Sequence, residues 1–269
     1  MKIILKKTAL IKLIGSETDI GFVPTMGAIH NGHISLIKKS IKQCDKTIVS
    51  IFVNKPQFNK KTDYAKYPRS IKKDIRKIRK LKIDFLYLPK AKEIYKNDPN
   101  KKIKIDSLEK KLCGKYRPGH FRAVVDVIDR FIKIINPKRM YLGKKDMQQL
   151  IIIKNFVKKK YPKIKIVGCK TIRENNGLAF SSRNFLLSNN EKINASKIYK
   201  LIRNNKNKII NKKVSLNFIK KNMIELGAKK IDYVNILDLN KLIYPRIIKK
   251  NYKVFIAYYL KSTRLIDNI

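Results

Sequence analysis

The chain has 269 residues, 43% of them hydrophobic, which suffices for one good core or for one large and one small domain. No apolar run approaches the length of a membrane span, and lysines interrupt the apolar N-terminal stretch MKIILKKTALIKLIG, which lacks a convincing signal-peptide cleavage site. The three cysteines are odd in number and widely spaced, which argues against a disulfide framework or a metal cluster. We therefore expect a soluble cytoplasmic protein.

The charge balance is extreme, with 65 Lys and Arg against 19 Asp and Glu and a net charge of +46. Such a surface attracts polyanions, and non-specific binding of nucleic acid at low salt is expected. The lysines are spread along the whole chain, however, and Asn and Ile are also abundant. Because a dedicated nucleic-acid binder concentrates its charge on one element or tail, we favour compositional drift as the origin of the excess.

Apolar periodicity predicts alternating strands and helices over the first 170 residues, beginning with a short strand and helix between Ile3 and Leu13 and a strand that Pro24 ends. Strands are predicted after these at 46–54, 83–88, 138–143 and 163–168, helices at 33–43, from Ser70 onward, at 121–135 and at 146–159, and a polar loop at 54–68. This alternation is typical of an α/β fold with a doubly wound parallel sheet, whose ligand crevice lies at the carboxyl ends of the strands.

The pattern changes near Leu187. Ser188 is placed to cap a helix that runs to about Arg203, a basic linker rich in Asn and Lys follows, and 215–226 predicts a second helix. Strand-like runs occur at 231–237, 252–260 and 263–267. We therefore expect a domain boundary near residue 186, with 1–186 as the larger domain and 187–269 as a smaller α+β domain.

The stretch GFVPTMGAIHNGH, Gly21–His33, predicts a strand, a tight turn and the start of a helix. His30 and His33 would lie together at the helix N-terminus, where unsatisfied N–H groups and a partial positive charge favour phosphate. Gly27 and Gly32 permit close approach of a ligand. A pair of surface or capping histidines is the plain alternative, and a zinc site is disfavoured because no third ligand stands nearby at a usual spacing.

Five stretches, in order, resemble the motifs of one family. PTMGAIHNGH is similar to the signature of the pantothenate synthetases, and its HNGH to the HxGH motif of the wider nucleotidylyltransferase superfamily. IFVNKPQF, RPGHF, GKKDMQQ and TIRENNGLAFSSRN resemble later segments of the same family, as does TRLIDN near the C-terminus. Five ordered motifs are far more specific than HxGH alone, so the chain is identified as a member of this family.

The resemblance implies a Rossmann-like sheet of the HxGH nucleotidylyltransferase type, carrying the nucleotide and pantoate sites, with residues 187–269 as a lid domain. It implies condensation of pantoate with β-alanine by ATP: the pantoate carboxylate attacks the α-phosphorus to give pantoyl adenylate and pyrophosphate, and the β-alanine amine then displaces AMP. ATP chemistry in turn implies Mg²⁺ held mainly by the ATP phosphates. A homodimer is also implied.

Residue roles in the nucleotide site follow from the matching motifs. His33 is expected to bond phosphate as charge moves to the leaving group, with His30 beside it and Lys145 as a phosphate contact. Asp146 is a ribose partner or a plain helix cap, and SSRN outside this context would be an ordinary turn. The expected nucleotide site comprises Met26, Gly27, Ala28, Ile29, His30, Asn31, Gly32, His33, Gly143, Lys144, Lys145, Asp146, Ile172, Phe180, Ser181, Ser182 and Arg183.

The acid site follows in the same way. Gln57 and Gln149 match the pantoate-binding glutamines of the family, and a neutral amide can hold a hydroxy acid without neutralising the carboxylate needed as nucleophile. Asn54, Arg117 and His120 are further expected contributors. Two departures stand out: Lys55 occupies the usual place of a proline, and Lys144 the place where Glu or Gln is common.

Two rival functions stay open on the sequence. Another HxGH nucleotidylyltransferase would adenylate a phosphate group instead of a carboxylate. A nucleic-acid-binding protein on the same scaffold would fit the charge, although the sequence offers no interleaved aromatic platform for bases.

Overall fold

A computed structural model of the chain describes residues 1–95, 98–100, 102–238 and 252–269. These residues form two compact units, Met1–Lys144 with Gln148–Lys170, and Lys145–Met147 with Thr171–Ile269. The second unit begins before the boundary expected at residue 186, because the loop after Lys170 bonds to the C-terminal sheet. In that loop Arg173 donates to the Asp267 carboxylate, with Nη1–Oδ2 at 2.6 Å. The domain boundary at residue 186 stays a prediction.

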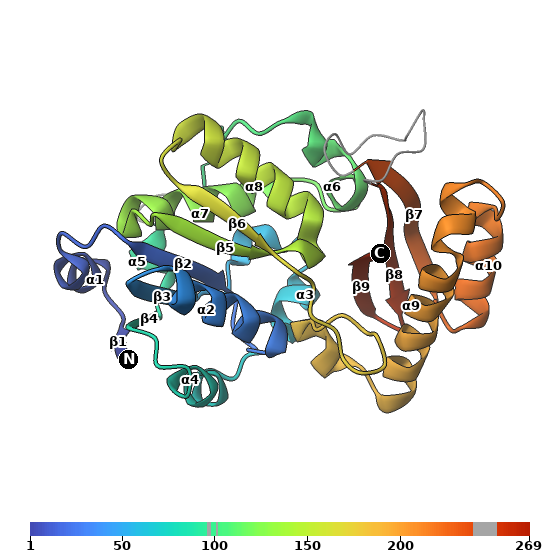
Figure 1. The fold of residues 1–269 in the computed structure, drawn as a ribbon, viewed down its shortest axis with the longest axis horizontal. Coiled ribbons are helices and arrows are strands. Elements are labelled where there is room, and N and C mark those ends of the chain that lie inside the picture. The colour runs from blue at the N-terminus through green and yellow to red at the C-terminus, as the bar shows by residue number, and fades with distance from the viewer. Residues whose placement is uncertain (96–97, 101, 239–251) are drawn as a thin grey trace. The chain divides into compact units, whose positions relative to one another are not determined.

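Six strands of the first unit, counted over the described residues, form a parallel sheet in the order β1-β4-β3-β2-β5-β6 (Figure 1). The central strands are buried almost throughout, as in sheets covered on both faces. The doubly wound sheet predicted from the sequence is thus confirmed. The strands are β1 (Lys2–Ile4), β2 (Ile20–Thr25), β3 (Lys46–Ile51), β4 (Phe85–Tyr87), β5 (Arg139–Gly143) and β6 (Lys165–Cys169).

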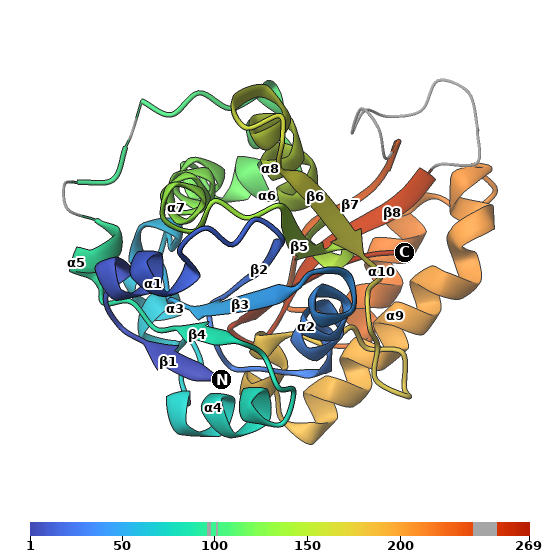
Figure 2. The same cartoon turned by 60° about the vertical axis from the view of Figure 1, so that its left-hand side comes forward.

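Helices cover both faces of this sheet. Figures 1 and 2 show α7 and α8 on one face and α2 and α4 on the other. Phe131 of α7 packs against Phe22 and Tyr87 of the sheet, whereas Ile37 of α2 and Ile78 of α4 share a core with Val49. The helices are α1 (Lys7–Ile14), α2 (Asn31–Gln43), α3 (Lys61–Lys66), α4 (Ile71–Arg79), α5 (Ala91–Ile94), α6 (Leu112–Tyr116), α7 (His120–Ile135) and α8 (Met147–Lys160), with 3₁₀ turns η1 (Lys55–Gln57), η2 (Ser107–Lys110) and η3 (Lys144–Asp146).

The second unit contains an antiparallel sheet of three described strands, β7 (Lys230–Asp238), β8 (Tyr252–Leu260) and β9 (Thr263–Asn268). Helices α9 (Asn189–Ile210) and α10 (Leu216–Glu225) pack against it, and η4 (Ser182–Leu186) precedes them. Ser188 begins α9 with a capping box to Glu191, as the sequence predicts for the cap. The smaller C-terminal α+β fold is therefore confirmed.

Three local predictions were wrong. Strand β2 continues through Pro24 to Thr25, because the fixed φ of proline suits extended backbone and the pairing with β3 runs on to Thr25 opposite Ile51. The segment expected as a polar loop contains η1 and α3. The expected basic linker after Arg203 is the last part of α9, since Ile209 continues the buried face of that helix.

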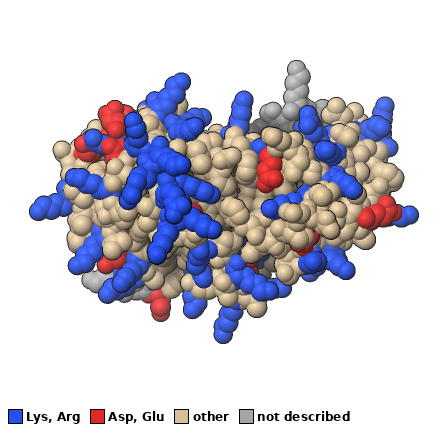
Figure 3. Space-filling view, turned by 90° about the horizontal axis from the view of Figure 1, so that it is seen from below, with Lys and Arg blue, Asp and Glu red and all other residues tan. Residues whose placement is uncertain are grey.

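Basic side chains outnumber acidic ones on the face of the molecule in Figure 3. Lys and Arg occur in many places there, and Asp and Glu in few. Helix α4 illustrates the composition, because its nine residues IKKDIRKIR contain five basic residues and one carboxylate, Asp74. Within the described residues, no helix is both long and apolar enough to cross a bilayer.

Candidate active site

The turn after β2 has an uncommon backbone. Gly27 and Ala28 both have positive φ, 81° and 49°, which for alanine is unfavourable unless the surroundings hold it. The Gly27 N–H donates to Oγ1 of Thr25 at 3.2 Å, and Thr25 in turn donates to the Ser50 carbonyl of β3 at 2.7 Å. The chain therefore leaves the carboxyl end of β2 in one fixed direction and enters α2.

Asp74 holds the same turn from the side. Its carboxylate accepts from the N–H of Ala28 at 2.8 Å and of Ile29 at 2.7 Å, and its side chain is almost completely buried. Lys77, one turn later on α4, donates from Nζ to the Ile29 carbonyl at 2.6 Å. A Cβ added to Gly27 would lie 3.0 Å from the Asp74 carboxylate, so a side chain there would crowd this contact. Helix α4 thus fixes the backbone that precedes the two histidines.

His30 and His33 lie at the start of α2, as the sequence predicts. His30 is the N-cap residue, with extended φ and ψ, and its carbonyl accepts from Ile34 at 3.1 Å. The two imidazole rings stack, with centroids 3.9 Å apart and planes 21° apart. No acidic residue lies in the first turn of α2, so no carboxylate there neutralises the positive end of the helix dipole. Asn31 is exposed and Gly32 half-buried in this turn.

A second group of predicted residues meets at η1, after β3. Gln57 is 8% exposed, and its Nε2 donates to the sulfur of Met26, in the turn after β2, at 2.9 Å. Asn54 is 1% exposed and donates from Nδ2 to Oε1 of Gln57 at 3.2 Å. The structure therefore joins Gln57 and Asn54, two of the expected acid-binding residues, to the turn of the expected nucleotide site. Lys55 and Pro56 form η1 with Gln57, so the displaced proline still leads into a regular turn.

Arg117, directly after α6, and His120, the first residue of α7, complete this group. Both side chains donate to the Gln57 carbonyl, His120 from Nδ1 at 2.8 Å and Arg117 from Nη2 at 3.2 Å. Because a carbonyl only accepts, Nδ1 of His120 carries a proton, and its Nε2 faces Nη1 of Arg117 at 3.0 Å. These two residues of the RPGHF stretch therefore hold the backbone of Gln57.

The carboxyl end of β5 contributes the next predicted residues. A Cβ built at Gly143 would meet nothing within 4 Å, so the space that a close ligand requires is open. Lys144 is exposed, and Gln149 is half-buried on the first turn of α8. The adjacent Gln148 is buried: it accepts from the Cys113 N–H at 3.0 Å and donates to the Leu108 and Lys111 carbonyls at 2.8 and 2.7 Å. Of the two glutamines, Gln148 has the structural contacts.

The remaining predicted residues lie in the second unit. Lys145 forms an ion pair with Asp146, Nζ–Oδ1 at 3.3 Å, and its side chain is 17% exposed against 46% for Asp146. Asn268 of β9 donates from Nδ2 to the Lys145 carbonyl at 2.7 Å. The C-terminal TRLIDN motif therefore positions the backbone of an expected phosphate contact.

The loop 171–183 is tied to that motif as well. Arg173 donates to both carboxylate oxygens of Asp267, at 2.6 and 2.9 Å. Its guanidinium carbon Cζ lies 4.2 Å from the centroid of the Tyr199 ring. Burial opposes the charge of Arg173, but the bonds to Asp267 raise its pKa. Ile172 accepts from the N–H of Phe180 at 3.1 Å. Ser181 then caps η4 by accepting from the Arg183 N–H at 3.3 Å, and Ser182 is buried beside it.

Sequence reasoning missed Asp74, Asp267 and Asn268. One carboxylate in the otherwise basic helix α4 was a signal, because a carboxylate retained in such a run needs a specific partner. TRLIDN was noted as a resemblance, but nothing in the sequence shows that Asp267 and Asn268 bond to Arg173 and Lys145.

Within the described part of the chain, no group of three or more His, Cys, Asp or Glu side chains could hold a metal ion. The stacked pair His30 and His33 has no carboxylate or thiol completing such a group there.

Comparisons with known proteins show what this chain is similar to over nearly its whole length. A family model described as Pantoate-beta-alanine ligase matches residues 3–269. The pantothenate synthetase of Clostridium botulinum (strain ATCC 19397 / Type A) is 43% identical over 254 residues, covering 93% of this chain and 90% of that protein. The pantothenate synthetase of Thermus thermophilus has a similar structure, with a TM-score of 0.90 at 29% identity and coverage of 100% and 99%.

A second solved structure is similar over the same length. The pantoate-beta-alanine ligase of Francisella tularensis, in complex with beta-gamma ATP and beta-alanine, gives a TM-score of 0.87 at 36% identity, covering 100% of this chain and 97% of that one. The family model, the relatives and the fold all point to one activity. The chain therefore belongs to the family of pantoate-beta-alanine ligases, enzymes also called pantothenate synthetases.

Proposed function

We propose that this ligase joins pantoate to β-alanine in two steps driven by ATP. The pantoate carboxylate attacks the α-phosphorus, forming pantoyl adenylate and releasing pyrophosphate. The β-alanine amine then attacks the acyl carbon, forming the amide of pantothenate, and AMP leaves. The first step is needed because a carboxylate is a poor acyl donor, whereas the mixed anhydride has a good leaving group. The Francisella relative solved with beta-gamma ATP and beta-alanine supports both substrates.

The observation that carries this proposal is the fixed turn Gly27–Ile29 leading into the two stacked histidines of α2. The N–H groups of Ala28 and Ile29 are already bonded to Asp74, so they hold the turn. The first turn of α2 begins at Asn31 and forms the positive end of the helix dipole, where backbone N–H groups suit phosphate oxygens. A preformed set of donors costs no reorganisation when charge moves to the leaving pyrophosphate.

His33 donates to the phosphates in this proposal, with His30 stacked beside it. An imidazole can donate near neutral pH and can hold a positive charge, which suits the growing charge on pyrophosphate. Met26 to His33 form one side of the nucleotide site, and Gly143 and Lys144 follow at the end of the neighbouring strand β5.

Gln57 and Gln149 bind pantoate in this proposal. The role of Gln57 is supported by the position of its amide beside Met26. An acid bound to this amide would lie next to the turn of the nucleotide site. Asn54, Arg117 and His120 fix the side chain and backbone of Gln57. Neutral amides hold the hydroxyl and carboxyl oxygens without removing the nucleophilicity of the carboxylate.

The second unit supplies the remaining phosphate donors in this proposal. Lys145 contacts phosphate, and Asp146 contacts the ribose. Ile172 and Phe180–Arg183 complete the nucleotide pocket, since two hydroxyls and a guanidinium are good donors to triphosphate oxygens. The ATP phosphates would supply most of the ligands of a bound Mg²⁺, and the ion would contribute positive charge beside the triphosphate.

The order of product release tests the two-step reaction. With ATP and pantoate alone, we expect one equivalent of pyrophosphate per active site and no AMP. AMP and pantothenate should form only after β-alanine is added. Release of AMP without β-alanine, or pyrophosphate release that does not need pantoate, contradicts the adenylate pathway.

Four expectations stay predictions. Sedimentation of the purified protein at several concentrations tests the homodimer. Microscopy of a tagged chain in its own cells tests the cytoplasmic location. A comparison of structures with and without ATP tests the role of the C-terminal part as a lid. Titration with a single-stranded oligonucleotide tests whether nucleic-acid binding is confined to low salt.

A further inference from the structure

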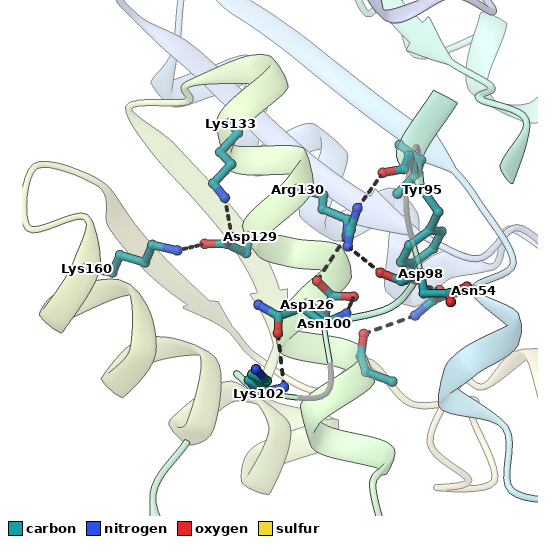
Figure 4. Close-up of polar contacts among 12 residues, drawn as sticks. Asn54, Tyr95, Asp98, Asn100, Lys102, Asp126, Asp129, Arg130, Lys133 and Lys160 are labelled. Atoms are coloured by element: carbon teal, nitrogen blue, oxygen red, sulfur yellow. Dashed lines mark hydrogen bonds and ion pairs between the residues drawn. The ribbon is translucent and has the colours of Figure 1, made fainter. Parts of the chain in front are cut away.

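A hydrogen-bond chain leads from the half-buried Tyr95 through the buried Asn54 to the buried Gln57 (Figure 4 shows its first two members). The hydroxyl of Tyr95 donates to Oδ1 of Asn54 at 2.7 Å. Nδ2 of Asn54 donates to Oε1 of Gln57 at 3.2 Å and to the Ala123 carbonyl at 3.1 Å. All three side chains belong to the first unit, and none of the motifs recognised in the sequence contains Tyr95.

The Ala123 carbonyl fixes the direction of this chain. A carbonyl only accepts, so the Asn54 atom facing it is the amide nitrogen, and the Asn54 oxygen therefore faces Tyr95. The second proton of that nitrogen points to Gln57, whose facing atom must then be the oxygen. The NH₂ group of Gln57 is consequently turned toward Met26 and the turn after β2.

Arg130 of α7 holds Tyr95 in place. Its guanidinium lies over the Tyr95 ring at 4.5 Å and donates from Nη1 to the Ile94 carbonyl at 3.1 Å. Its Nε donates to Asp126 at 3.0 Å, so its own position is fixed by the helix (Figure 4). Burial is the main cause that raises the pKa of Tyr95, and the negative charge of Asp126 raises it further. The hydroxyl therefore stays protonated and can donate.

We infer that Tyr95 is a positioning residue for the acid substrate: acting through Asn54, it orients Gln57 so that the Gln57 NH₂ donates to an oxygen of pantoate. This inference rests on the proposed role of Gln57 as a pantoate ligand. Without the Tyr95 hydroxyl, the buried Oδ1 of Asn54 loses its donor, and the amide of Asn54 is no longer held at the angle that serves Gln57. The oriented NH₂ favours acids whose oxygens accept hydrogen bonds there.

The test compares Tyr95→Phe with Tyr87→Phe. Both changes remove one tyrosine hydroxyl from the same aromatic cluster around Phe52 and Phe131, where Tyr87 is buried and Tyr95 half-buried. The Tyr87 hydroxyl has no hydrogen-bond partner among the described residues, so Tyr87→Phe is the matched control. We expect Tyr95→Phe to raise the KM for pantoate about five- to tenfold, with the KM for ATP and kcat within about twofold of the original. Tyr87→Phe should leave all three constants within about twofold.

Two variants of Gln57 separate this inference from the proposed function. Gln57→Ala should raise the KM for pantoate more than Tyr95→Phe does. Gln57→Glu, which presents only acceptors, should raise it further still. If Gln57→Ala leaves the KM for pantoate unchanged, the proposed role of Gln57 fails, and the inference fails with it. If Gln57→Ala raises that KM while Tyr95→Phe behaves like Tyr87→Phe, only the role of Tyr95 is overturned. Equal rises in the KM for ATP and pantoate in Tyr95→Phe also overturn it.

Discussion

The backbone N–H of Ala28 donates to the carboxylate of Asp74 at 2.8 Å, joining the turn after β2 to helix α4 across a sequence separation of 46 residues. Asp74 is 2% exposed, and the residue it holds has a positive φ. A positive φ at alanine costs free energy, and the contact with Asp74 offsets that cost by satisfying the buried N–H groups of both Ala28 and Ile29. The conformation of the proposed phosphate-binding turn therefore depends on a residue of another helix.

Asp74→Ala removes this support. We expect it to lower the free energy of unfolding by about 3 kcal/mol, because two buried N–H groups lose their acceptor. The KM for ATP should rise about tenfold in the protein that remains folded. Urea unfolding and steady-state kinetics measure the two effects. Asp45→Ala, which removes an exposed carboxylate, is the control for net charge and should change neither quantity. An Asp74→Ala protein as stable as the control contradicts this account of the turn.

His33→Ala tests the proposed phosphate donor. Loss of one aligned donor at a developing charge costs about 100-fold in rate, so pantoate-dependent pyrophosphate release should fall by about that factor. The thermal midpoint should change by less than about 2 °C, because the His33 ring is half-buried at a helix end and is not part of the apolar core. His33→Asn, which keeps a donor, should recover part of the rate. Turnover close to the original in His33→Ala would place the triphosphate elsewhere.

Lys145→Ala should also slow adenylation by about 100-fold, without loss of folding. The backbone of Lys145 is held by Asn268, so removal of its side chain leaves the turn in place. The rate of pyrophosphate release at saturating ATP and pantoate is the measurement. Lys154→Ala removes an exposed lysine of α8 and controls for the change in overall charge. Equal rates in the two variants would show that Lys145 contributes only to the general positive field.

Asp129 provides a prediction on pH. Burial opposes its charge, but hydrogen bonds from Lys160 at 2.7 Å and Tyr161 at 2.7 Å, and the ion pair with Lys133 at 3.0 Å, lower its pKa (Figure 4 shows both lysines). Because the pKa is lower in the folded state, the carboxylate stabilises the fold above its unfolded value near 3.8. That contribution is lost as the pH falls through the lowered folded value.

Asp129→Asn should therefore destabilise the protein at pH 7 by about 1 kcal/mol, since both lysines are partly exposed and solvent screens them. The difference in free energy of unfolding between the two proteins should shrink as the pH falls below about 4. Urea titrations from pH 7 to pH 3 measure it. A difference that stays constant over this range would mean that hydrogen bonding or packing, and not the charge of Asp129, stabilises the site.

The sequence predicted most of the fold because its signals are local. The apolar repeat that predicts a helix at 33–43 and the cap at Ser188 depend on neighbours within one element, and the starts of both helices were placed to within about two residues. The errors at Pro24 and in α9 have the same origin, since pairing with β3 and packing of Ile209 are tertiary effects. Local composition cannot show them.

The candidate site was predicted less completely, since its residues were found by their resemblance to family motifs and not by their contacts. That resemblance gives residue identities but not the groups that hold them. Asp74 at Ala28, Tyr95 at Asn54 and Asn268 at Lys145 each bond a site residue over more than 40 positions of sequence. No pattern in a single amino-acid sequence shows that such distant residues are in contact. These supporting contacts could therefore be found only in the structure.

Two adjacent glutamines of α8 give the last prediction. Gln149 is half-buried and proposed to bind pantoate, whereas Gln148 is buried and bonds to Cys113, Leu108 and Lys111. Gln149→Ala should raise the KM for pantoate about tenfold and leave the KM for ATP within about twofold, with little change in stability. Gln148→Ala should instead lower the free energy of unfolding by about 2 kcal/mol, because the buried N–H of Cys113 loses its side-chain acceptor and the Leu108 and Lys111 carbonyls each lose one donor.

Steady-state kinetics and urea unfolding of both glutamine variants separate these roles. The two residues are chemically identical and adjacent on one helix, so each variant is the control for the other. A rise in the KM for ATP that exceeds the rise for pantoate in Gln149→Ala would remove Gln149 from the acid site. Loss of pantoate affinity in Gln148→Ala at unchanged stability would mean that the buried glutamine, and not its half-buried neighbour, reaches the substrate.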